Sequence, residues 1–147
     1  MGRKNSPSAN KELNELIAQY ETARAENRQL YLDGDQLADI ADQYAAGRKF
    51  NEAQEVITYG LHLHPDSTDL LVEQAYLYLD TGKIPLAKKV VESITDEYDT
   101  DVKMLKAELM LNEGQLENAR NVLDTIEDAD ELETIINLVY LYMDMGS

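Results

Sequence analysis

The stretch that decides the fold is residues 69–94, DLLVEQAYLYLDTGKIPLAKKVVESI, because it aligns without gaps with residues 101–126, DVKMLKAELMLNEGQLENARNVLDTI. Apolar residues match apolar residues at most positions of this alignment, and the central glycines, Gly82 and Gly114, are 32 residues apart. A fixed period of this length is the signature of repeat architectures, in which each unit buries its apolar face against its neighbour. The sequence therefore predicts stacked copies of one structural unit.

Within each unit, apolar residues recur at helical spacing on both sides of the glycine, and a polar cluster follows the second run. The glycine marks a turn between two helices, and Asp, Ser and Thr in the polar clusters favour the start of the next helix. Pro85 directly follows the Gly82 turn, where the first turn of a helix tolerates a missing N–H. Each unit is therefore predicted to be an antiparallel helical hairpin, and the fold class to be an all-α solenoid.

The same phase extends backward to Ala53, after a turn at Gly47, and forward to an apolar run that ends before Gly146. The predicted array covers residues 35–147, with units at 35–66, 69–98 and 101–128 and a half unit at 131–147. Residues 11–32 carry one apolar stripe at helical spacing, and we expect them to form a helix that caps the first unit. Residues 1–10 are expected to be a disordered leader.

The units resemble the tetratricopeptide repeat, whose pattern places a large apolar residue, a small residue and a tyrosine on the first helix, and an alanine, an apolar residue and a proline on the second. The first unit matches this pattern best, at Leu37, Ile40, Ala41, Tyr44, Phe50, Ala53, Ile57, Gly60 and Pro65. The third unit departs from it, because Lys103 replaces the usual large apolar residue and Met110 replaces the tyrosine. The resemblance implies a right-handed superhelix whose concave face, formed by the first helices, contacts a ligand.

The resemblance assigns partner contacts to aligned positions on the first helices. In successive units these positions hold Val72, Tyr76 and Leu79, then Met104, Glu108 and Leu111, then Ile136, Tyr140 and Met143. The spacing i, i+4, i+7 keeps each trio on one helical face, separate from core positions such as Ala75. Acidic residues surround this stripe, among them Asp42, Glu73 and Asp80. We therefore predict a non-catalytic scaffold that binds a protein or peptide segment with apolar or aromatic anchors and basic flanks.

Two alternatives to the groove stay open. The last predicted helix has apolar residues but no second helix to pack on within this sequence; these residues are Ile135, Leu138, Val139 and Tyr142. We therefore expect either that the sequence is a fragment of a longer array or that the chain forms a homodimer through this face. Alternatively, the helix over 11–32, absent repeats or a symmetric copy covers the apolar stripe.

Charge narrows the classes of partner. The formal net charge is −16 at pH 7, and it is unevenly distributed. Basic and acidic residues balance up to Gly34, so the whole excess follows from Asp35 onward. Nucleic acids and anionic membrane surfaces are bound through Lys and Arg, so neither is an expected partner. Because the sequence has no long apolar run and no secretory signal, a cytoplasmic chain is expected.

We expect no catalytic, cofactor or metal site. The two histidines, His62 and His64, are two residues apart and do not share a helical face, and the chain has no cysteine. Carboxylate runs such as residues 127–131 are typical of solvated helix caps. Asp99 and Asp101 flank Thr100 without the glycine and the spaced glutamate of a calcium loop.

Overall fold

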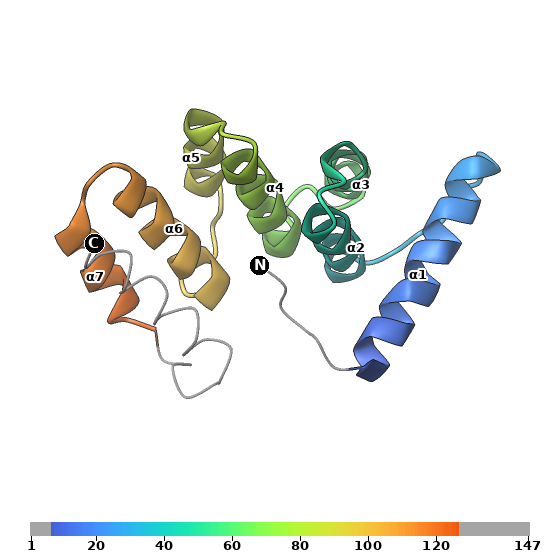
Figure 1. Ribbon diagram of the computed structural model, residues 1–147, viewed down its shortest axis with the longest axis horizontal. Coiled ribbons are helices and arrows are strands. Elements are labelled where there is room, and N and C mark those ends of the chain that lie inside the picture. Colours follow the sequence, from blue (N-terminus) through green and yellow to red (C-terminus); the bar gives the residue numbers. More distant parts are fainter. Residues whose placement is uncertain (1–6, 127–147) are drawn as a thin grey trace. The chain divides into compact units, whose positions relative to one another are not determined.

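The computed structural model describes residues 7–126, which contain seven α-helices and no β-strand within that range (Figure 1). In chain order they are α1 (Pro7–Ala25), α2 (Gly34–Ala46), α3 (Phe50–Leu63), α4 (Thr68–Asp80), α5 (Ile84–Glu92), α6 (Thr100–Asn112) and α7 (Leu116–Leu123). The described residues divide into two compact units, with the boundary inside α4, after Leu77. The predicted all-α fold class is confirmed.

The first compact unit is built around the antiparallel hairpin of α2 and α3. The Asp33 backbone N–H donates to Gln36 Oε1 at 3.0 Å, and this bond satisfies a donor that the start of α2 would otherwise leave unpaired. The side chains that fill the hairpin are at most 1% exposed, and they are Leu37, Ile40, Ala41, Ala53, Val56 and Ile57. The apolar positions read from the sequence at helical spacing are therefore the positions that the hairpin buries.

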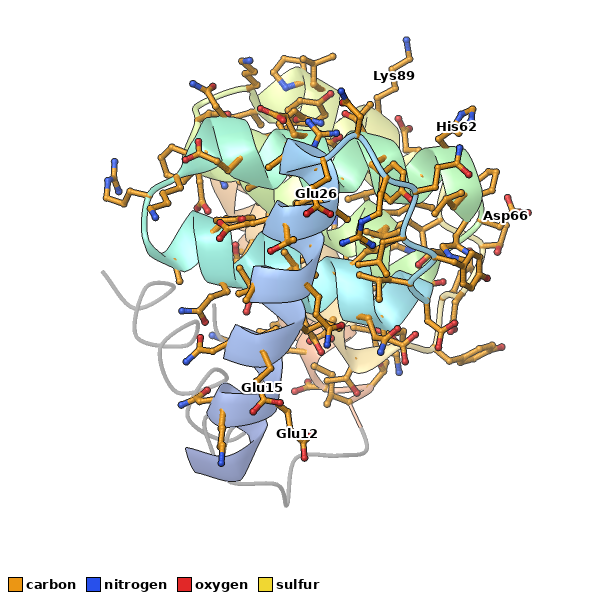
Figure 2. All side chains as sticks on the ribbon, turned by 90° about the vertical axis from the view of Figure 1, so that its right-hand side faces the viewer. Glu12, Glu15, Glu26, His62, Asp66 and Lys89 are labelled. Atoms are coloured by element: carbon orange, nitrogen blue, oxygen red, sulfur yellow. The ribbon has the colours of Figure 1, made fainter. Side chains whose placement is uncertain are left out.

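α1 packs against this hairpin through one side. Tyr20 and Ala23 are 5% and 2% exposed, and Leu13, Leu16 and Ile17 are partly buried against the same core. Glu12 and Glu15 are exposed and extend away from the helices behind α1 (Figure 2). One side of α1 therefore lies against the hairpin, whereas Glu12 and Glu15 are exposed on it.

The ends of α1 differ from the predicted range of 11–32. The helix begins at Pro7, inside the expected leader, because proline suits the first turn. It ends at Ala25 because Asn27 takes the left-handed backbone conformation, with φ of 54°, and the Arg28 N–H donates to the Ala23 carbonyl at 2.8 Å. The residues between α1 and α2 form a non-helical connector rather than the last turns of a helix.

The second compact unit contains α5, α6 and α7. Gly82 and Gly114 both have φ of 76°, which L-residues with a side chain rarely adopt, so the turns that precede α5 and α7 require glycine. The Asp99 carboxylate caps α6 by accepting from the Val102 N–H at 3.1 Å. The core between α6 and α7 consists of Met104, Ala107, Ala119, Leu123 and Ile126. The two glycines that align in the sequence, Gly82 and Gly114, therefore form turns with the same backbone conformation.

Candidate functional site

The predicted partner contacts on α4 differ in exposure. Val72 is 2% exposed and Glu73 is 6% exposed, so the fold covers both side chains. Tyr76 and Leu79 are partly exposed, and Asp80, at the end of the helix, is exposed. Tyr76, Leu79 and Asp80 are therefore the α4 residues of the predicted stripe that another molecule can reach.

The equivalent residues of α6 lie mostly against the core. Met104 is 3% exposed and belongs to the cluster shared with α7, and Leu111 packs against that cluster while remaining partly exposed. Glu108 is partly exposed on the same helix. Asp42, predicted for the acidic rim, is partly exposed on α2. The spacing that places the α6 trio on one helical face therefore also turns its apolar members toward a covered surface.

The third predicted trio lies outside the described residues. It consists of Ile136, Tyr140 and Met143. The predicted self-association face, which includes Ile135 and Tyr142, also falls there, as does the half unit at 131–147. These assignments stay predictions from the sequence.

A cleft of about 500 Å³ lies in the second unit, between α5 and α6. Its apolar lining comes from Val91, Ile94, Leu109 and Met110, and its charged lining from Lys88, Glu92, Glu97, Lys106 and Glu113. Lys88 Nζ donates to Glu113 Oε2 at 3.0 Å across the cleft, and this hydrogen bond raises the pKa of Lys88. This cleft could not be predicted from the sequence, because the repeat pattern indicates which residues are apolar and not where packed helices leave space.

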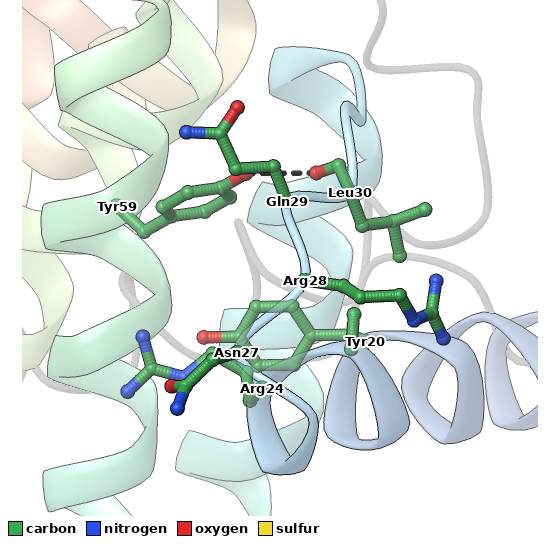
Figure 3. A pocket seen from close by; sticks show the side chains of 8 residues that line it. Tyr20, Arg24, Asn27, Arg28, Gln29, Leu30 and Tyr59 are labelled. Carbon is green, nitrogen blue, oxygen red and sulfur yellow. Dashed lines mark hydrogen bonds between the residues drawn. The ribbon is translucent and has the colours of Figure 1, made fainter.

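A second hollow, the α1 pocket, lies in the first unit where α1 ends (Figure 3). It has a volume of about 300 Å³ and is lined by Tyr20, Ala23, Arg24, Asn27, Arg28, Gln29, Leu30 and Tyr59. Tyr59 of α3 donates its hydroxyl hydrogen to the Leu30 carbonyl at 2.8 Å, so the connector is fixed against α3. The rings of Tyr20 and Tyr59 lie with their centroids 6.4 Å apart and their planes inclined by 53°.

The two arginines of the α1 pocket are paired differently. Arg24 Nη2 donates to Glu55 Oε2 on α3 at 2.5 Å, and the guanidinium carbon lies 6.0 Å from the centroid of the Tyr20 ring. Arg28 Nε donates to Glu26 Oε1 at 2.6 Å, and its guanidinium points away from the Tyr20 hydroxyl in Figure 3. The only sequence signal for this pocket was the balanced charge of the N-terminal segment, which contains both arginines.

Two buried tyrosines of the first unit, Tyr20 and Tyr44, differ in the hydrogen bonding of their hydroxyl groups. Burial raises the pKa of Tyr20, whose hydroxyl makes no hydrogen bond to any described residue. Burial also raises the pKa of Tyr44, as does the hydrogen bond that the Tyr44 hydroxyl donates to Glu21 Oε2 at 2.5 Å. Tyr44 thus joins α2 to α1, whereas the Tyr20 hydroxyl has no such role.

The two histidines do not converge on a common point. His62 is exposed on the surface of α3 (Figure 2), whereas His64 is partly buried and its Nε2 lies 2.8 Å from the Leu32 carbonyl oxygen. Within residues 7–126, no group of three or more His, Asp or Glu side chains is placed to hold a metal ion. In the same range, no helix combines the length and the apolar character that a bilayer crossing requires.

Comparison of the sequence with protein families gives a match over residues 44–109. Residues 44–109 match the tetratricopeptide repeat family, from the end of α2 through α3, α4 and α5 and into α6. Comparison with curated proteins and with solved structures gives no match. The match includes the Gly82 turn and ends before Gly114, and it confirms the resemblance found in the sequence. The repeat region at residues 44–109, which is less than half of the chain, is therefore similar to the tetratricopeptide repeat.

Proposed function

We propose that this chain is a non-catalytic scaffold that binds a protein or peptide segment through the first helices of its repeats. Repeats of this family are generally protein interaction modules rather than catalysts. The observation that carries the proposal is on α4, where the partly exposed Tyr76 and Leu79 lie beside the exposed carboxylate of Asp80. A partly exposed tyrosine next to an apolar residue is typical of the anchoring centre of an interface.

Charge supports the choice of partner. The chain carries −16, and the excess of acidic residues begins at Asp35, where the repeats begin. An acidic surface accelerates association with a basic partner and disfavours an acidic one. The proposed partner is therefore a segment with apolar or aromatic anchors flanked by Lys or Arg.

In this proposal the stripe residues have two roles. The reachable residues Tyr76, Leu79 and Glu108 contact the partner, together with Tyr140 of the predicted half unit at 131–147. Val72, Met104 and Leu111 support the helices that present them, since Val72 and Met104 are covered and Leu111 packs against the core. The acidic residues around the stripe, of which Asp80 is exposed, favour a partner with positive charge.

The experiment is affinity capture from the native cell with the intact chain, compared with a variant that carries Tyr76→Ala and Tyr140→Ala. The variant is expected to lose the captured protein while its helicity by circular dichroism stays unchanged. Tyr98→Ala is the matched control, because Tyr98 is 85% exposed and lies in the connector between α5 and α6. Unchanged capture by the double variant would contradict the proposal.

A second experiment tests whether the partner is positively charged. Asp80→Lys reverses an exposed charge at the end of α4 and is expected to slow association of the captured partner. Raising the salt concentration is expected to reduce the difference between this variant and the unaltered chain, because salt screens exposed charges. Association that is faster with Asp80→Lys would contradict a basic partner.

A further inference from the structure

The Tyr20 hydroxyl is the unusual polar group of the first unit. Tyr20 is 5% exposed, and its hydroxyl makes no hydrogen bond to any described residue. Buried polar atoms in folded proteins nearly always have a partner, so an unpaired one beside a hollow favours a partner from outside the chain. A phenol can donate one hydrogen bond and accept others. The α1 pocket, which Tyr20 lines, is the place from which such a partner would come.

The charge of the α1 pocket selects the ligand. The described residues that line it include Arg24 and Arg28 and no carboxylate, in a chain that carries −16. The remaining lining donors are the side-chain amides of Asn27 and Gln29. A cationic ligand is therefore disfavoured, and an anion that accepts hydrogen bonds is favoured.

We propose that the α1 pocket binds a small organic carboxylate with an apolar or aromatic body. The carboxylate accepts hydrogen bonds from the Tyr20 hydroxyl and from Arg24, whose guanidinium has five donors and uses one of them on Glu55. The body of the ligand packs on the Tyr20 and Tyr59 rings and on Leu30. A volume of about 300 Å³ is at the lower end of small-molecule sites, which fits a single ring with a short side chain.

A single negative charge fits this pocket better than a double one. Arg24 already neutralises Glu55, and Arg28 is paired with Glu26 and points away from the Tyr20 hydroxyl (Figure 3). A phosphate dianion would thus have too little positive charge to replace its hydration. A planar carboxylate needs one guanidinium edge and one hydroxyl, which Arg24 and Tyr20 supply.

Binding requires a side-chain movement. The Tyr20 hydroxyl is covered, and the Arg24 side chain beside the Tyr20 ring is 50% exposed. Exposed ion pairs such as Arg24 with Glu55 add little stability, so the Arg24 side chain can change rotamer at small cost. None of these residues belongs to the surface proposed to bind a protein segment, so the two proposals can fail independently.

The test uses phenylacetate as the probe with the intact chain, followed by the tyrosine ring signals in NMR spectra and by calorimetric titration. The expected result is saturable binding with a dissociation constant of about 1 mM. Tyr20→Phe, which removes only the hydroxyl, and Arg24→Gln are each expected to weaken binding about tenfold. Lys88→Gln is the matched control, because it also removes a cation from an exposed ion pair with glutamate but lies outside the α1 pocket, and it is expected to leave binding unchanged.

Two further probes define the chemistry. Phenylacetamide keeps the ring and removes the charge, and phenyl phosphate keeps the ring and doubles the charge; both are expected to bind more weakly than phenylacetate. Saturable binding of the amide as tight as that of phenylacetate would overturn the carboxylate assignment, as would tighter binding of phenyl phosphate. Absence of phenylacetate binding, or equal binding by Tyr20→Phe, would overturn the site itself.

Discussion

The side-chain amides of Gln54 and Gln74 donate to each other and join α3 to α4 within the first unit. Gln54 Nε2 lies 2.8 Å from Gln74 Oε1, and Gln74 Nε2 lies 2.9 Å from Gln54 Oε1. Gln74 is 6% exposed and Gln54 is partly exposed, so this pair is a partly buried polar contact between the two helices. Its geometry fixes the register of the two helices more strictly than apolar packing does, because each amide has to face the other.

Replacing one glutamine of this pair is expected to be worse than replacing both. Gln74→Leu leaves the Gln54 amide oxygen without its donor, while Gln54 Nε2 keeps its bond to Thr58 Oγ1, and the change is expected to lower the free energy of unfolding by about 1–3 kcal/mol. The double variant with Gln54→Leu removes both polar groups and should recover part of that loss. Urea denaturation of the three chains measures the difference. A double variant less stable than Gln74→Leu alone would contradict this explanation.

Gly60 is expected to tolerate no side chain. A Cβ at this position would lie 2.8 Å from Leu70 Cδ1 and 3.0 Å from Leu70 Cδ2, both in the core of the first unit. Gly60→Ala should therefore lower the free energy of unfolding by about 1–3 kcal/mol in thermal or urea denaturation.

Gly47→Ala is the matched control for Gly60→Ala. At Gly47 the nearest atom to a new Cβ is the Tyr44 carbonyl oxygen, 3.6 Å away, and φ is −86°. This variant is expected to remain within about 0.5 kcal/mol of the unaltered chain. Equal effects at Gly47 and Gly60 would show that the close approach to Leu70 does not govern stability.

The local structure of the repeats could be predicted from the sequence because it depends on short-range rules. The period between Gly82 and Gly114 predicted two equivalent turns, and both glycines take the left-handed conformation. Ala53, Ala87 and Ala119 occupy the aligned small positions, and all are at most 1% exposed. Helical spacing and glycine chemistry were sufficient for this part of the fold.

The candidate sites were less predictable because they depend on which helical faces are covered. Val72 and Tyr76 share a face by spacing, yet Val72 is 2% exposed and Tyr76 is partly exposed. Periodicity shows that a face is apolar but not whether another helix lies on it. The α1 pocket was missed for a related reason, since Asn27 ends α1 early and leaves a connector in which a longer helix was expected.

Tyr44 is expected to make the fold sensitive to alkaline pH. The folded chain keeps the Tyr44 phenol protonated above its ordinary pKa of 10.0, because burial and the hydrogen bond to Glu21 raise the pKa. Above about pH 10 the unfolded chain releases this proton while the folded chain retains it, so the free energy of unfolding falls as pH rises. Below that pH the contribution of Tyr44 is fully present.

The variant Tyr44→Phe isolates this effect. At pH 7 it is expected to cost about 1 kcal/mol, because the hydrogen bond to the exposed Glu21 is lost. Above about pH 10 its stability should fall less steeply than that of the unaltered chain, since one raised pKa is gone. Urea denaturation at a series of pH values gives both slopes. Identical slopes would show that another group is responsible for the alkaline sensitivity.

Asp99 is expected to control the start of α6 through its side chain. Its Oδ1 accepts from the Val102 N–H at 3.1 Å, in a position where the helix has no carbonyl partner for that donor. Asp99→Ala should lower the free energy of unfolding by about 1 kcal/mol, whereas Asp99→Asn should retain most of the stability because an amide oxygen also accepts from the N–H. If Asp99→Asn lost as much as Asp99→Ala, the negative charge near the helix dipole would be the stabilising feature, and salt would then reduce the loss.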